Sequence, residues 1–254
     1  MHKSWLAAVA VVLPACTSLA QELPRHYDPY LGRTAPEDRA WFSHVADAYE
    51  EAFVAGNGRV VDPQNRNISH SEGQGYGMLI AVLGDDREAF ERMWGFARRS
   101  LQRSDALFMW KYEADGRTPD INNASDGELL IASALVLGGM RWNEVGYGRE
   151  AARIARALRD KLVLRYAGYT LLMPGEWARP TRLRPRAIVN LSYYIPFALE
   201  LMERIDPAGP WRELIDDGER LLSRLIRAPS DWSTINDYGE PDPAPGWRPQ
   251  LGYD

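Results

Sequence analysis

Apolar side chains recur at helical spacing along most of this chain, and this periodicity constrains its fold more than any other feature. The first such segment begins with a capping box and a proline at residues 34–37, continues with apolar residues at 41, 45, 48 and 52, and closes at Gly56. Further helices are expected over residues 74–83, 85–101, 125–138, 148–165, 192–205 and 210–226. Short apolar runs such as Leu107–Tyr112 and Tyr169–Met173 are candidate strands, but the sequence has no regular strand pattern. Helices of roughly 10 to 20 residues joined by Gly/Pro/Asn-rich loops predict an all-α fold in which helices pack on helices.

The segment after Asp85 and Asp86, either of which can cap its start, has the clearest apolar stripe. The residues expected to be buried along it are Phe90, Met93, Trp94, Ala97 and Leu101. We find no internal repeat and no linker that would divide two domains, so residues 21–254 are expected to form one domain. Residues 229–254, rich in Pro, Asp, Gly and Trp, are typical of a long functional loop.

The N-terminus has the pattern of an export signal over residues 1–20. A short basic region with Lys3 precedes an apolar run at residues 5–13, and small residues before Gln21 fit a cleavage site after Ala20. The apolar run is too short to span a bilayer. We therefore expect a secreted or periplasmic protein, with lipid attachment at Cys16 as the less favoured alternative. Cys16 is the only cysteine, so cleavage after Ala20 leaves neither an intrachain disulfide nor a thiol nucleophile.

Composition narrows the classes of partner. The formal net charge of −5 argues against a nucleic-acid partner, because phosphate binding requires a basic face. The 9 tryptophans and 12 tyrosines provide flat apolar rings, which serve core packing more often than they bind ligands such as sugar rings. No His, Cys and carboxylate cluster has the spacing of a metal site, and we expect no cofactor.

Glu72 stands before three glycines at alternate positions, Gly73, Gly75 and Gly77. Positions without a side chain let another backbone or a ligand approach closely. The alternative for Glu72 is an ordinary acidic residue in a first helical turn. A serine–histidine pair formed by the preceding Ser71 and His70 is disfavoured, because adjacent residues rarely point at one another and no nucleophile elbow is present.

Four blocks of the sequence together resemble glycoside hydrolase family 8. The first runs from Gly58 through Ser71-Glu72-Gly73-Gln74-Gly75-Tyr76-Gly77-Met78. The others are Trp110-Lys111-Tyr112 with Asn122-Asn123-Ala124-Ser125-Asp126-Gly127-Glu128, then Asn190-Leu191-Ser192-Tyr193-Tyr194, then Gly252-Tyr253-Asp254. The resemblance covers most of residues 35–254. Within the family, the sequence is similar to the cellulases of bacterial cellulose-synthesis systems.

This resemblance implies an (α/α)6 barrel and endo-acting hydrolysis of β-1,4-glucan with inversion at the anomeric carbon. It makes Glu72 the general acid, Asp126 the aspartate beside the scissile bond, and Asp254 the residue that activates water. An inverting pair needs its carboxyl groups roughly 6.5–9.5 Å apart, and its acid must keep its proton near neutral pH. Asp126 has an alternative as a first-turn residue within a capping box formed by Ser125 and Glu128. Whether Asp126 or Asp254 is the partner of Glu72 stays open at this point.

The candidate substrate-binding residues share a polar or aromatic side chain within these blocks. They are Tyr76, Trp110, Asn123, Tyr193 and Tyr194, with Trp247 as a further candidate platform for a sugar ring. Core packing is the alternative for the aromatic residues, and capping a turn is the alternative for Asn123. The partner implied is a β-1,4-glucan polysaccharide or oligosaccharide. We expect a monomer, and an association with a cellulose-synthesis complex stays open.

Two features depart from the family pattern. Glu128 occupies a position where the family motif more often carries aspartate. The family domain continues past the block that begins at Gly252, so the resemblance implies a C-terminally truncated fragment and an incomplete barrel. Exposed apolar helix faces cost roughly 25 cal/mol per Å², against a stability of about 5–15 kcal/mol. We therefore expect the polypeptide ending at Asp254 to be poorly active or unstable.

Two alternatives to an endoglucanase stay open. One is a family member that acts on xylan, chitosan or mixed-linkage glucan. The other is a catalytically inactive glucan-binding accessory of cellulose synthesis.

Overall fold

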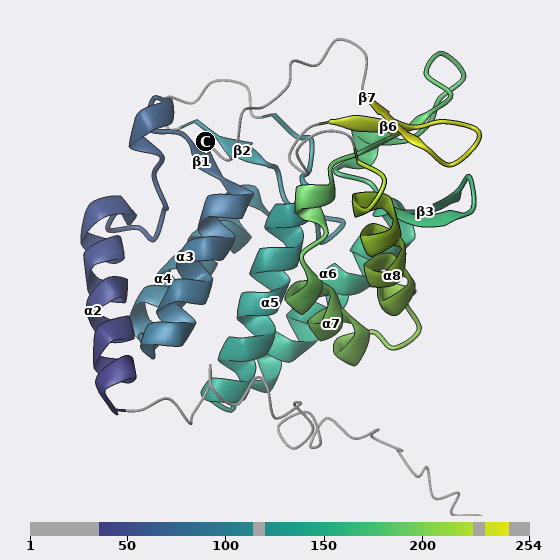
Figure 1. Cartoon of the computed structure of the whole chain (residues 1–254). Helices are drawn as coiled ribbons and strands as arrows, with labels where there is room; N and C mark the ends of the chain where they lie inside the picture. Colours follow the sequence, from purple (N-terminus) through teal and green to yellow (C-terminus); the bar gives the residue numbers. More distant parts are fainter. Residues whose placement is uncertain (1–35, 114–119, 226–231, 244–254) are drawn as a thin grey trace, which may run out of the picture.

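Seven α-helices account for most of the chain that can be described. The computed structural model describes residues 36–113, 120–225 and 232–243 (Figure 1). Within them the helices are α2 (Pro36–Phe53), α3 (Ser71–Gly84), α4 (Arg87–Phe96), α5 (Ser125–Arg141), α6 (Val145–Leu162), α7 (Pro196–Ile205) and α8 (Trp211–Leu222). One π-helical turn, Ala97–Leu101, extends α4, and short 3-10 turns occupy Pro63–Asn65, Glu176–Ala178 and Leu191–Tyr193. The all-α character predicted from the periodicity is confirmed in these residues.

In the described part of the chain the strands are short and form three small antiparallel sheets. Strand β1 (Ser69–His70) pairs with β2 (Lys111–Tyr112), and β3 (Val163–Tyr166) forms a hairpin with β4 (Tyr169–Leu172). The third sheet has the order β5 (Ala187–Val189), β6 (Ser233–Ile235), β7 (Pro241–Pro243). Helices α3 and α5 both begin at the end of the molecule where the labelled strands gather, at the top of Figure 1. Side chains in the first turns of these helices therefore come together at one end.

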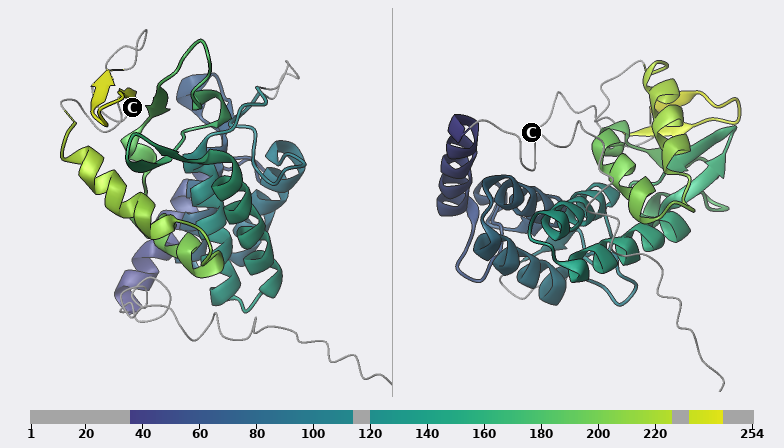
Figure 2. Two further views of the ribbon diagram at one scale, coloured as in Figure 1. Left: turned by 90° about the vertical axis from the view of Figure 1, so that its right-hand side faces the viewer. Right: turned by 90° about the horizontal axis from the view of Figure 1, so that it is seen from below.

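Helix α5 is the centre of the helix packing. Every residue from Ser125 to Gly138 is buried, as expected for a helix that is covered on all sides. It packs against α3, α6 and α7, while α3 also contacts α2 and α4, and α7 contacts α8. The view from below in Figure 2 shows this sequence of neighbouring helices, with α2 at one edge and the α7–α8 pair at the other.

Several predicted helix ends are shifted in the structure. Helix α3 begins at Ser71 rather than residue 74, so Glu72 lies inside its first turn. Helix α7 begins at Pro196, because residues 191–193 form a separate 3-10 turn and proline favours a first helical position. Asp86 caps α4 by accepting a hydrogen bond from the Ala89 N–H (2.8 Å), and the predicted apolar stripe of α4 is buried.

Two local predictions are wrong. The apolar residues predicted along α2 do not form its contact face, since Trp41, Ala48 and Ala52 are exposed and Ala46 is buried instead. The expected capping box of α5 is absent as well. Ala124 is the N-cap residue of α5, the Ser125 hydroxyl has no hydrogen-bond partner among the described residues, and the Glu128 carboxylate accepts from Phe108 and Asn123. Thr34, the first residue of the other predicted capping box, lies outside the described residues.

Candidate active site

Glu72 lies in the first turn of α3, at the strand end of the helix bundle. Burial raises the pKa of its carboxyl above the ordinary value, and a hydrogen bond with Tyr76 lowers it in part. Tyr76 lies one helical turn further along and is 46% exposed, so its ring faces open space beside the carboxyl. The structure therefore places Glu72 and Tyr76 together, in an environment that favours a protonated carboxyl.

The glycines around Glu72 let α3 approach its neighbours. A methyl group on Gly75 would lie 2.6 Å from the Leu130 Cβ of α5, and one on Gly77 would lie 2.8 Å from the Met93 sulfur. At Gly73 the nearest atom, in Val60, would be 3.9 Å away, an ordinary contact. Two of the three glycines therefore serve close helix packing, as the sequence pattern indicated.

Gln74 in the same motif is buried and connects α3 to its surroundings. Its side-chain oxygen accepts from the Val60 N–H (3.0 Å), and its nitrogen donates to the carbonyls of Gly58 (2.7 Å) and Met93 (3.0 Å). These bonds satisfy backbone groups that would otherwise be buried without partners. They also hold the start of α3, and with it Glu72, in a fixed place.

Asp126 lies in the first turn of α5, directly beside the first turn of α3. Gly127 permits this approach, because a Cβ there would come within 2.2 Å of the Ser71 hydroxyl and 2.9 Å of the Glu72 nitrogen. Burial and the charge of Glu72 raise the pKa of Asp126 to about 7. Hydrogen bonds from its own N–H, from the Gly127 N–H (2.8 Å) and from the Tyr193 hydroxyl oppose this rise. The structure thus brings two of the three predicted catalytic residues together as an interacting carboxyl pair.

Tyr193 connects the carboxyl pair to further aromatic rings. Burial and the charges of Asp126 and Glu72 raise the pKa of its phenol, which therefore stays protonated and donates to Asp126. Its ring packs edge-on against Trp232 (5.9 Å between centroids), and Trp232 packs against Trp177 (5.3 Å). Sequence reasoning missed Trp177 and Trp232. The available signal for Trp177 was a tryptophan two residues after Gly175, within a Pro/Gly turn; both Trp177 and Trp232 are only partly buried where they pack against the core.

Trp110 lies beside the start of α3, to which its backbone is hydrogen-bonded. The backbone N–H of Trp110 donates to the Asn122 carbonyl (2.8 Å). The backbone carbonyl of Trp110 accepts from the N–H of Ser71 (3.0 Å), the residue before Glu72. The His70 ring is stacked on its indole (5.9 Å, 12°), and the Lys111 ammonium lies 5.5 Å from the ring centre. A partly exposed ring held in this way next to Glu72 fits the predicted sugar platform.

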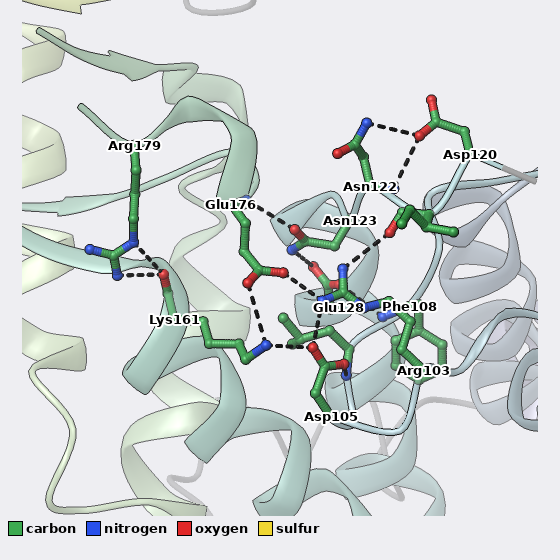
Figure 3. Close-up of polar contacts among 12 residues, drawn as sticks. Arg103, Asp105, Phe108, Asp120, Asn122, Asn123, Glu128, Lys161, Glu176 and Arg179 are labelled. Carbon is green, nitrogen blue, oxygen red and sulfur yellow. Dashed lines mark hydrogen bonds and ion pairs between the residues drawn. The ribbon is translucent and has the colours of Figure 1, made fainter. Parts of the chain in front are cut away.

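Asn123 is buried behind the site rather than open to it. Its side-chain oxygen accepts from the Glu176 N–H (3.0 Å), and its nitrogen faces Glu128 at 3.3 Å (Figure 3). Tyr194 is also in the core, 9% exposed. Its hydroxyl accepts from the Leu172 N–H (2.7 Å), and its ring fills the space above Gly218. For Tyr194 the structure thus favours core packing, the alternative left open by the sequence. Asp254 and Trp247 lie outside the described residues.

The described residues contain neither a metal-binding cluster nor a membrane-spanning helix. No group of three or more His, Cys, Asp or Glu side chains in that part of the chain is arranged to hold a metal ion. None of the described helices is long and apolar enough to cross a membrane.

Comparison with known proteins identifies similar sequences and folds. The model of "Glycosyl hydrolases family 8" matches residues 37–254. A probable endoglucanase of Novacetimonas hansenii is 38% identical over 216 residues, which are 81% of this chain and 62% of that protein. An endoglucanase of Cellulomonas uda is 33% identical over 223 residues, 85% of this chain and 62% of that protein. A solved family 8 endo-β-1,4-glucanase from an Achatina fulica gut metagenomic library superposes with a TM-score of 0.77 at 33% identity, covering 82% of this chain and 68% of that one.

These matches confirm the fold expected from the sequence, an all-α chain with the helix packing of the (α/α)6 type. The chain spans about 62% of the length of the two curated relatives.

Proposed function

Because the chain belongs to glycosyl hydrolases family 8, we propose that it hydrolyses internal β-1,4-glucosidic bonds of cellulose-type glucans. The observation that carries this proposal is the contact between the first turns of α3 and α5, which sets two carboxyl groups with raised pKa values side by side. Hydrolysis of a glycosidic bond needs a carboxylic acid to protonate the leaving oxygen and a carboxylate to activate water. The substrate class agrees with the names of the endoglucanases that the chain resembles.

In the proposed mechanism Glu72 is the general acid. Its partly buried position keeps the proton on the carboxyl until the leaving oxygen takes it. Asp126 is proposed to contact the sugar next to the scissile bond, and the Tyr193 hydroxyl, which donates to its carboxylate, holds its orientation. Trp110 and Trp177 provide apolar faces on either side for sugar rings.

Asp254 is proposed as the base that activates water on the opposite face of the sugar, which gives inversion. Asp126 in the base role is the alternative. Asp126→Asn and Asp254→Asn discriminate between them, since azide restores turnover only where the base has been removed. Proton NMR of the first product then checks inversion, which requires the α-anomer from a β-linked substrate.

The decisive measurement compares the purified protein with Glu72→Gln. We expect release of reducing sugar from carboxymethylcellulose to fall by about 10²–10⁴-fold in the variant, because a general acid contributes about that much. Binding of cellopentaose should persist, since the amide keeps the shape of the carboxyl. Equal rates in the two proteins would contradict the role of Glu72. Unchanged cellulose production by cells carrying Glu72→Gln would instead favour a binding accessory without catalysis.

Export is part of the same proposal. Residues 1–20 are proposed to direct the protein out of the cytoplasm and to be cleaved after Ala20, which N-terminal sequencing of the mature protein tests. We propose a monomer that acts on its own or beside a cellulose-synthesis complex.

A further inference from the structure

Glu128 is a fully buried carboxyl that the proposed mechanism does not use. One of its oxygens accepts from the Phe108 N–H (3.0 Å), and the other accepts from the Asn123 side-chain nitrogen (3.3 Å). Both bonds reach segments that flank the active site rather than residues of its own helix. Figure 3 shows Glu128 and Asn123 between these two segments.

The direction of the Glu128–Asn123 hydrogen bond is determined by a third group. The Asn123 oxygen accepts from the Glu176 N–H (3.0 Å), so its nitrogen must be the atom that faces Glu128. Glu128 therefore meets a donor at each oxygen, an arrangement that suits an ionised carboxylate. Burial raises the pKa of Glu128 well above its usual value, while the bonds from Phe108 and Asn123 act in the opposite direction.

One side of this pair holds the segment that carries Trp110. The hydrogen bond from the Phe108 N–H to Glu128 anchors residues 107–112 to α5. The backbone N–H of Trp110 donates to the carbonyl of Asn122, the residue before Asn123. Trp110 in turn accepts from the Ser71 N–H at the start of α3. The place of the Trp110 ring relative to Glu72 thus depends on this anchor.

The other side of the pair holds the turn that carries Trp177. Glu176 donates its N–H to Asn123, Ser125 donates to the Pro174 carbonyl (2.9 Å), and a Cβ on Gly175 would lie 2.5 Å from the Asn123 carbonyl. The Glu176 carboxylate then enters an ion-pair ring with Arg103, Asp105 and Lys161. Figure 3 shows this ring joining the turn to the chain segment before Phe108.

We propose that Glu128, through its hydrogen bond with Asn123, is a positioning residue that sets the separation of the Trp110 and Trp177 platforms across the active site. This inference rests on the proposed function, because it assigns the pair to glucan binding rather than to proton transfer. Glu128 and Asn123 act behind the platforms, and neither needs to touch the sugar.

The test reverses the polarity of the hydrogen bond. In Glu128→Gln the new amide nitrogen faces the Asn123 side-chain nitrogen, and both are donors. In Asn123→Asp the new carboxylate oxygen faces the Glu128 carboxylate oxygen, and both are acceptors. In the double variant Glu128→Gln/Asn123→Asp the new amide donates to the new carboxylate, which still accepts from Glu176. The hydrogen bond between residues 128 and 123 is thereby restored with its direction exchanged, the Phe108 and Glu176 N–H groups still donate as before, and the total charge is unchanged.

We expect each single variant to raise the Kd for cellopentaose about tenfold, as loss of one buried hydrogen bond predicts. Turnover at saturating substrate should change less than threefold, because the hydrogen bonds of Glu72 with Tyr76 and of Asp126 with Gly127 and Tyr193 are untouched. The double variant should return the Kd to within about threefold of the original. Glu219→Gln, the same chemical change on the exposed face of α8, is the matched control.

Amide hydrogen exchange at Phe108 and Glu176 gives a readout that needs no substrate. Exchange should be faster in each single variant and slow again in the double variant. An unchanged Kd in Glu128→Gln, or a double variant as weak as the singles, would overturn the positioning role while leaving the proposed function intact. Absence of cellopentaose binding by the unsubstituted protein would overturn the function and the positioning role together, even if the exchange data matched.

Discussion

At the scale of single residues, the site consists of carboxyl groups that differ in their surroundings. Glu72 is partly buried and bonded to Tyr76, whereas Asp126 is 4% exposed and accepts bonds from Gly127 and Tyr193. Different surroundings assign different roles to chemically similar groups, because burial favours the neutral form and donors favour the charged form. The two carboxyls also interact, so they titrate as a pair.

The pH dependence of stability tests the environment of Asp126. Its pKa rises from 3.8 to about 7 on folding, so ionisation of Asp126 opposes folding. This cost is absent below about pH 4 and grows as pH rises through 7, to on the order of 4 kcal/mol. Asp126→Asn cannot ionise, so the free energy of unfolding of the variant should rise relative to that of the original protein across this range. Urea unfolding at pH 4 to 8 measures the difference, and a difference independent of pH would contradict the raised pKa.

At the scale of elements, the site depends on how closely α3 and α5 approach. Gly75 and Gly127 lie at the contact, where a methyl group on either would collide with the facing helix. Gly127 lies against Ser71 and the Glu72 backbone, so the same contact that packs the helices brings the two carboxyls together. Close packing and the geometry of the site therefore have one structural cause.

Two substitutions in one motif separate packing from helix propensity. Gly75→Ala should destabilise the protein by about 1–3 kcal/mol, because its Cβ would lie 2.6 Å from Leu130 and force the helices apart. Gly73→Ala meets no atom nearer than 3.9 Å and should be neutral or stabilising by up to about 1 kcal/mol, since alanine favours a helix over glycine. Thermal unfolding of both variants provides the measurement. Similar losses in the two would show that glycine flexibility, not helix contact, is required.

At the scale of the whole molecule, the site is assembled from segments far apart in the chain. The first turns of α3 and α5, the segment with Trp110, the turn with Trp177 and the residue Trp232 all meet at the strand end of the bundle. Hydrogen bonds and ring contacts join these segments to one another. A ligand that spans them should therefore stabilise the entire fold.

Glucan binding is accordingly expected to raise the thermal stability of the protein. At a concentration one hundred times the Kd, cellopentaose should add about 2.7 kcal/mol, or roughly 5–10 °C in Tm for a chain of this size. Differential scanning calorimetry with and without the oligosaccharide measures the shift, and maltopentaose serves as the α-linked control. A Tm that responds equally to both sugars, or to neither, would argue against a β-glucan site.

Local patterns in the sequence were sufficient for the fold class, most of the helices and the placement of Glu72 beside closely packed glycines. Periodicity records which side chains are buried, and burial is what stabilises a helix in a folded chain. The pattern was less informative at α2. Helical spacing correctly predicted a helix there, but the apolar residues at that spacing are not the ones that are buried. Helix ends were shifted at α3 and α7 because capping depends on the preceding turn as well as on the residue type.

Only the tertiary structure decided which side chains meet. In the structure Asp126 lies beside Glu72, and Tyr194 packs in the core. Trp232 contacts both Tyr193 and Trp177. The Glu128 carboxylate accepts from Phe108 and Asn123 and takes no part in a capping box. The physical reason is that these contacts join residues from different elements. The direction of a buried side chain is then determined by the facing helix and by the donors it must satisfy, and neither can be read from spacing along one segment.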